Sequence, residues 1–152
     1  LLAAALAAGL PAAAQQAQVG ADEAGMKTLR TRVAKDHRAV MQENLPLTDA
    51  EAKKFWPVYD AYLKDLADAT RRQNRAIIDY VNTESTMSDP QAKPIAREIA
   101  SAEEAEGKAR RAFFRKVEEI LPGKKAARAM QIENKIRAVR QFDLAATFPL
   151  VK

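Results

Sequence analysis

The chain has 152 residues, of which 47% are hydrophobic and 30% charged, and its formal net charge is +5. This balance is typical of a single soluble, folded domain. The absence of cysteine excludes disulfides, zinc–thiolate sites and thiol nucleophiles, and the single histidine excludes a histidine-rich metal site. With only five glycines, phosphate-binding loops and a turn-rich β fold are disfavoured, so we expect no enzyme, no catalytic residue and no cofactor.

The first segment, residues 1–14, reads LLAAALAAGLPAAA and carries no charged residue. An apolar run that ends in Gly-Leu-Pro and three alanines is typical of a secretory signal peptide, and it is shorter than the ~20 residues of a membrane span. The alternative is a buried hydrophobic helix. We expect a signal peptide remnant over 1–14, a mature start near Gln15, a flexible lead-in over 15–25 and a single helical domain over 26–152. If the source is a Gram-negative bacterium, the destination is the periplasm.

Apolar residues recur at helical spacing after this segment and predict four helices, over residues 26–44, 49–82, 89–121 and 124–146. No stretch alternates with period two, so the expected fold is all-α without a sheet. On the second helix the expected apolar stripe is Phe55, Tyr59, Tyr62, Leu66, Gln73, Ile77 and Val81. Three polar residues interrupt this stripe near the middle of the helix: Thr70, Gln73 and Asn74. They predict either that the contact between helices is thinner and more mobile there, or that these side chains set the register of the helices.

Acidic residues stand four positions before basic ones on the faces opposite these stripes. Such pairs stabilise a helix by only ~0.2–0.5 kcal/mol each, but they indicate surface that faces solvent. We therefore expect these carboxylates to lie at the surface. The pairs are Asp60/Lys64, Asp68/Arg72, Glu104/Lys108, Glu106/Arg110 and Glu133/Arg137.

Prolines predict where the helices end or bend. The sequence Leu121-Pro122-Gly123 predicts the break between the third and fourth helices. Pro57 lacks an amide hydrogen and is expected to bend the second helix near residues 53–57. Pro94 leaves two alternatives: the third helix begins at Asp89 and kinks, or it begins at Pro94 itself.

Two similar motifs stand before the second and third helices, LTDAE at 47–51 and MSDPQ at 87–91. Each combines a hydroxyl residue that caps the helix with an acid or amide three residues later that reaches back to the cap amide, which is the pattern of a capping box. The apolar residue before each cap can pack on the first turn. The residues of the two motifs are Leu47, Thr48, Glu51, Met87, Ser88 and Gln91.

An exported small helical protein with two such boxes resembles the Spy/CpxP family of periplasmic proteins, which is defined by a paired Leu-Thr-x-x-Gln motif. Glu51 stands in place of Gln in the first copy, and Met87-Ser88 in place of Leu-Thr in the second. The runs FWPVYDAY (55–62) and QIENKIRAVRQFDLAATFPLV (131–151) also resemble a group of uncharacterised exported proteobacterial proteins. The resemblance implies a long, bent antiparallel helical hairpin that pairs with a second copy into a cradle-like homodimer.

The same resemblance implies an activity. Members of the family hold unfolded or damaged envelope proteins without ATP, or regulate a membrane sensor of envelope stress, and some bind zinc or nickel. We expect a non-enzymatic, stress-protective, chaperone-like binder of unfolded proteins. The alternatives are a soluble regulatory partner of a stress sensor, a weak metal-binding or buffering protein, and a plain structural bundle. The single histidine and absent cysteine argue against the metal alternative.

Basic residues cluster on the predicted helices, and we expect them to form a cationic surface that attracts acidic or unfolded clients within the Debye length. The alternative is a solvated helix face without a partner. Nucleic acid is not an expected partner, because no platform of interleaved aromatic and basic residues is evident. The candidate client-binding residues are Arg71, Arg72, Arg75, Arg110, Arg111 and Arg115.

Four aromatic residues lie within eight positions: Phe55, Trp56, Tyr59 and Tyr62. We expect them to anchor the packing where helices cross, and the alternative is an apolar patch that contacts clients. His37 lies next to Asp36 on the apolar stripe of the first helix, and we expect it to be partly buried with its polar atoms satisfied. The alternative for His37 is a weak metal site shared with carboxylates.

Overall fold

The structure, a computed structural model, describes residues 23–148 and residue 150. In these residues it contains five α-helices: α1 (Glu23–Lys35), α2 (His37–Asn44), α3 (Asp49–Thr83), α4 (Asp89–Ile120) and α5 (Gly123–Thr147). No strand occurs in that part of the chain, which confirms the all-α prediction, and none of its helices is long and apolar enough to cross a membrane. The predicted signal peptide, and the predicted lead-in up to residue 22, lie outside the described residues.

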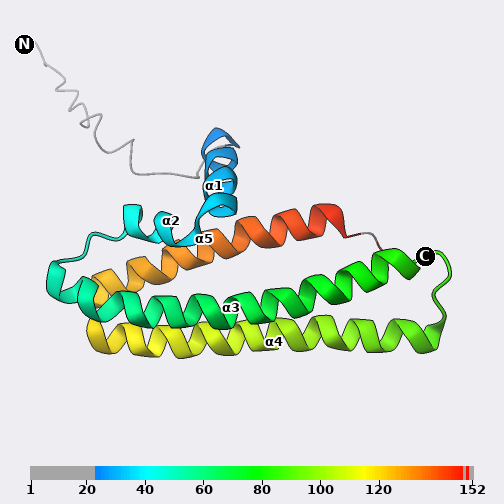
Figure 1. Ribbon diagram of the computed structural model, residues 1–152. Coiled ribbons are helices and arrows are strands. Elements are labelled where there is room, and N and C mark those ends of the chain that lie inside the picture. The colour runs from blue at the N-terminus through cyan, green and yellow to red at the C-terminus, as the bar shows by residue number, and fades with distance from the viewer. Residues whose placement is uncertain (1–22, 149, 151–152) are drawn as a thin grey trace, which may run out of the picture.

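The helices α3 and α4 lie side by side along their length as the expected antiparallel hairpin (Figure 1). From the turn that follows α4, α5 runs back along the hairpin, and it diverges from α3 towards its own C-terminal end. The short helix α2 packs on α5, and α1 packs on both α2 and α5 at a steep inclination to α5. The helix α2 also contacts α3, because Arg38 pairs with Asp60 at 2.8 Å and lies over the Trp56 ring at 4.3 Å.

The first predicted helix is divided in two, so the predicted count of four helices is wrong by one. Asp36 has extended backbone angles, φ −159° and ψ 98°, between α1 and α2. Its amide donates to the Arg32 carbonyl at 2.9 Å, which ends α1, and its carboxylate accepts the Ala39 amide at 2.9 Å, which caps α2. Aspartate is among the best N-cap residues, and here that local preference interrupts an apolar stripe that continues on both sides. The helix α1 also begins at Glu23, three residues before the predicted start at residue 26.

Both capping motifs begin helices where predicted. The Glu51 amide donates to Thr48 Oγ1 at 3.3 Å, and the Thr48 amide donates to Glu51 Oε2 at 2.7 Å. In the second motif, the Ser88 amide and hydroxyl both donate to Gln91 Oε1, at 2.9 and 2.8 Å. The first motif has an additional partner, because Lys125 at the start of α5 lies 2.5 Å from Glu51 Oε2. Lys125 and the Thr48 amide hold the pKa of Glu51 below its usual value.

The helix α4 begins at Asp89, as in the first of the two alternatives, and Pro94 lies inside it. The kink at Pro94 stays a prediction. Pro57 likewise lies inside the unbroken helix α3. Both prolines are exposed, so the backbone carbonyl that each deprives of a partner faces water rather than the core. The predicted bend near Pro57 stays a prediction.

A core rich in aromatic residues fills one half of the molecule, which we call the proximal half: residues 49–66 of α3 and 109–120 of α4, with α1, α2 and α5. The ring centroids of Tyr62 and Phe113 lie 4.6 Å apart in a stacked pair, and those of Phe55 and Tyr59 lie 5.5 Å apart. Phe55 and Tyr59 have no exposed surface, and Tyr62 is only 5% exposed. The prediction that these aromatics anchor the packing is therefore confirmed for all three.

The other half of the hairpin, which we call the distal half, comprises residues 69–83 of α3 and 89–105 of α4. Its buried residues are mostly small: Ala69, Gln73, Ala76, Tyr80 and Ala102. On α3 the buried residues continue the alternating four- and three-residue spacing of the proximal half, from residue 55 to residue 80. The predicted stripe through Ile77 and Val81 is therefore wrong, because Val81 is 48% exposed and Ile77 only half-buried, whereas Ala76 and Tyr80 occupy the seam.

Candidate functional site

Two carboxylates expected at the surface are buried. Glu106 is 5% exposed and Glu133 is 2% exposed, so the interpretation of Glu106/Arg110 and Glu133/Arg137 as solvent-facing pairs is wrong. The distance of each glutamate along the helix from apolar residues of the core indicated that it is buried. Glu106 lies four residues after the buried Ala102 and seven before the buried Phe113, which places it on the core face of α4. On α5, Glu133 similarly stands three residues before the buried Ile136.

Glu133 is held by three side chains from two other helices. The Tyr59 hydroxyl donates to its Oε1 at 2.6 Å, and the Tyr62 hydroxyl donates to its Oε2 at 3.0 Å. His37 Nε2, at the start of α2, lies 3.0 Å from Oε1, and because a carboxylate oxygen accepts, Nε2 is the nitrogen that carries hydrogen. His37 is half-buried, as expected.

The protonation of the two tyrosines favours this arrangement. Burial, and then the nearby Glu133 carboxylate, raise the pKa of Tyr59 and Tyr62 far above the usual value for a phenol. Both hydroxyls therefore remain protonated donors at physiological pH. Since buried carboxylates are costly unless fully hydrogen-bonded, the donors of α2 and α3 fix the position of α5 at this point.

Glu106 makes the second buried contact to α5. Arg137 Nε lies 3.0 Å from its Oε1, and Arg140 pairs with its other oxygen. Glu106 and Glu133 thus connect α5 to α4, α3 and α2 through side chains close to the aromatic core. In the described part of the chain no group of three or more His, Asp or Glu side chains could hold a metal ion.

The six predicted client-binding arginines lie in two groups rather than on one surface. Arg72 donates from Nε to Glu98 at 2.9 Å and from a terminal nitrogen to Ser101 at 3.1 Å, so it joins the two helices of the hairpin. Arg71 pairs with Asp68 one turn away. The remaining group, Arg110, Arg111 and Arg115, lies further along α4. Thirteen residues separate Glu98 from Arg111 along α4, which is about 20 Å at the rise of an α-helix.

The first group forms a surface with apolar side chains that sequence reasoning did not single out. Ile78 is 57% exposed and Val81 is 48% exposed. Each member of this surface lies three or four positions from another member on α3, so they share one exposed face in the distal half. We call this face the distal strip; its residues are Arg71, Asn74, Arg75, Ile78 and Val81. In the sequence, the exposure of Ile78 and Val81 was indicated by their position outside the four-and-three spacing of the residues buried along α3.

A cleft on the adjoining side of α3 separates the distal half from α5. It is lined by Thr70, Gln73 and Asn74 of α3 and by Arg140, Asp143 and Leu144 of α5, and it has a volume of about 320 Å³. Gln73 is buried and donates to Glu103 at 3.3 Å. The three polar residues that interrupt the seam of α3 therefore line this cleft together with residues from the C-terminal part of α5. No protein-family model, no curated protein and no solved structure matches the chain.

Proposed function

We propose that this protein is a non-enzymatic, ATP-independent binder of partly unfolded polypeptides, and that the distal strip is its contact surface. The observation that supports the proposal is the exposure of Ile78 and Val81 beside two arginines on one face of a helix. Large aliphatic side chains clustered on a surface, rather than scattered singly, are typical of interaction sites.

The composition of the strip suits a client without fixed structure. Its cations raise the rate of encounter with chains that carry acidic residues, and this contribution is screened by salt. Its aliphatic side chains then bury apolar surface of the client, at about 25 cal/mol per Å², with little dependence on salt. Neither contribution requires a specific partner sequence, which is the property that a general protective binder needs.

We further propose that the protein acts in the periplasm. The signal-like residues 1–14 support export, and the two motifs that begin the helices of the hairpin support the resemblance to the Spy/CpxP family. We propose a periplasmic protein that protects unfolded or damaged envelope proteins and pairs as a homodimer. Light scattering at micromolar concentration tests the dimer, and a monomer mass would contradict it.

The binding proposal is tested by light scattering from a chemically denatured substrate as it aggregates, with equimolar protein and no nucleotide. One double variant, Arg71→Glu with Arg75→Glu, removes the cations of the strip. A second, Ile78→Asp with Val81→Asp, removes its apolar side chains. The matched control, Arg111→Glu with Arg115→Glu, makes the same charge change at exposed positions on α4.

We expect the wild type and the control to suppress aggregation and both strip variants to suppress it less. The loss in the arginine variant should reflect slower capture, and salt should reduce wild-type capture as the Debye length falls from ~10 Å at 0.1 M to ~3 Å at 1 M. All four proteins should unfold at similar temperatures, since exposed positions contribute little to stability. No suppression by the wild type, or equal suppression by all four proteins, would contradict the proposal.

A further inference from the structure

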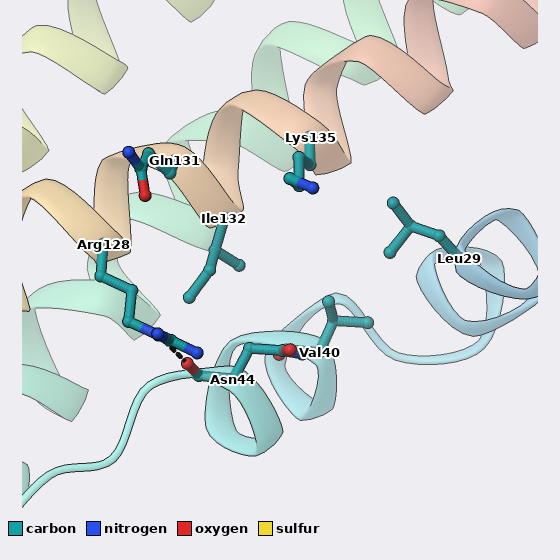
Figure 2. A pocket seen from close by; sticks show the side chains of 7 residues that line it. All are labelled: Leu29, Val40, Asn44, Arg128, Gln131, Ile132 and Lys135. Carbon is teal, nitrogen blue, oxygen red and sulfur yellow. Dashed lines mark hydrogen bonds between the residues drawn. The ribbon is translucent and has the colours of Figure 1, made fainter. Parts of the chain in front are cut away.

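A pocket of about 240 Å³ lies between α2 and α5 and is closed at one end by α1. Figure 2 shows Val40 and Asn44 on α2 opposite a row of α5 side chains, with Leu29 of α1 at the end. The pocket belongs to the proximal half and shares no residue with the distal strip. Its volume corresponds to roughly eight water molecules, so it suits a group about the size of one amino-acid residue.

The walls of the pocket combine an apolar floor with a basic mouth. Leu29, Val40 and Ile132 are 6%, 4% and 9% exposed, and they present aliphatic groups from three helices. The other side chains that line it are amides or cations: Asn44, Arg128, Gln131 and Lys135. None of the described lining residues is acidic, and Arg128 and Lys135 are cations.

Arg128 is oriented at this mouth by the backbone of the opposite helix. Its Nε donates to the Asn44 carbonyl at 2.6 Å, a bond drawn as the dashed line in Figure 2. That bond fixes the plane of the guanidinium, and within the described chain no other bond occupies its terminal nitrogens. A guanidinium held in this way presents parallel N–H groups that match the two oxygens of a carboxylate.

We propose that this pocket binds a carboxylate attached to a short branched aliphatic group. The carboxylate would lie on Arg128 at the mouth, and the aliphatic group would cover Leu29, Val40 and Ile132. Two sources share this chemistry: the C-terminal residue of a polypeptide that ends in leucine or valine, and a free branched short-chain acid. The proposal is independent of the distal strip, and neither fails with the other.

The test is an NMR titration of the ¹⁵N-labelled protein with N-acetyl-leucine, N-acetyl-leucinamide and 4-methylpentanoate. The signals to follow are the backbone amides of residues 40–44 and 128–135 and the side-chain amides of Asn44 and Gln131. We expect saturable shifts with N-acetyl-leucine and none with its amide, which lacks the charge. Binding of 4-methylpentanoate with similar affinity supports a free acid as the source, and much weaker binding supports a polypeptide C-terminus.

Variants separate this site from unspecific binding. Arg128→Gln should raise the Kd for N-acetyl-leucine about ten-fold or more, because a charge-assisted hydrogen bond is lost. Gln131→Trp places a large ring at an exposed position of the mouth and should abolish binding without disturbing the core. Arg115→Gln, on the outer face of α4, should leave the Kd unchanged. Absence of saturable shifts, equal binding of acid and amide, or an unchanged Kd in Arg128→Gln would overturn the proposal.

Discussion

The two halves of the α3–α4 hairpin follow the same spacing of buried residues but are filled differently. In the proximal half Phe55, Tyr59, Tyr62 and Phe113 are buried, and in the distal half the seam consists mostly of alanines. An aromatic side chain buries about 150–250 Å², several times what a methyl group can bury. The spacing therefore determines which face of each helix meets its neighbour, whereas the size of the side chains determines how much stability that contact supplies.

The difference also accounts for the exposed apolar residues. In the proximal half, α5 supplies a further layer that covers side chains outside the seam. In the distal half α5 diverges from α3 (Figure 1), and Ile78 and Val81 remain 57% and 48% exposed. The same sequence thus makes one half a stable core and the other a thin, accessible surface.

The largest expected effect comes from truncating a buried aromatic in the proximal half. Phe113→Ala should lower the free energy of unfolding by about 3–5 kcal/mol, through lost burial and the cavity left behind. Urea unfolding followed by circular dichroism measures the change. The matched control is Phe142→Ala, at a position that is 60% exposed with the Arg30 guanidinium 5.3 Å from the ring centroid, and it should cost about 1 kcal/mol or less. Similar losses in the two variants would contradict the conclusion that the buried aromatic residues of the proximal half supply most of the stability.

A smaller effect is expected at the buried carboxylate. Tyr59→Phe removes the 2.6 Å hydrogen bond to Glu133 and should cost about 1.5–3 kcal/mol, the usual range for a bond to a charged group. In a Glu133→Leu background the hydroxyl has lost this acceptor, so the same change should cost nothing or stabilise the protein. Urea unfolding of the four proteins of this cycle gives the coupling, and equal costs in both backgrounds would show that the hydroxyl acts independently of Glu133.

Hydrogen exchange compares the two halves without any mutation. Amides of residues 76–83, in the distal half, should exchange at least about ten times faster than those of residues 59–66. The reason is that local opening of the distal half exposes mostly alanines together with Tyr80, whereas opening of the proximal half exposes several packed aromatic rings. Native-state exchange measured by NMR gives the rates. Uniform protection along α3 would show that the hairpin opens as a single unit.

The smallest expected effect concerns the start of α3. Thr48→Ala removes the acceptor of the Glu51 amide and should cost about 1 kcal/mol. The matched control, Thr86→Ala, changes an exposed threonine in the turn before α4 and should alter stability by less than about 0.5 kcal/mol. Thermal unfolding in parallel samples distinguishes the two, and a larger loss in the control would contradict the assigned role of the cap.

Helix boundaries were the most predictable feature, because the interactions that set them are local. The caps at Thr48 and Ser88 and the break at Pro122 each depend on residues within about four positions. Asp36 carries the same kind of signal, and the break there was missed because the apolar stripe runs across it. The exposed apolar face of the distal half could also be predicted from the sequence, since Ile78 and Val81 lie outside the four-and-three spacing of the buried residues of α3.

By itself the sequence determined an all-α chain, the places where most helices begin and the faces that the aromatic residues bury. Only the tertiary structure decided the partners of the polar side chains. Glu133 contacts His37, 96 positions earlier, and Tyr59, 74 positions earlier, while its neighbour in the predicted pair, Arg137, contacts Glu106 on another helix. The physical reason is that an exposed pair on one helix gains only a few tenths of a kcal/mol, whereas a buried carboxylate must be fully hydrogen-bonded by whichever donors the packing brings to it.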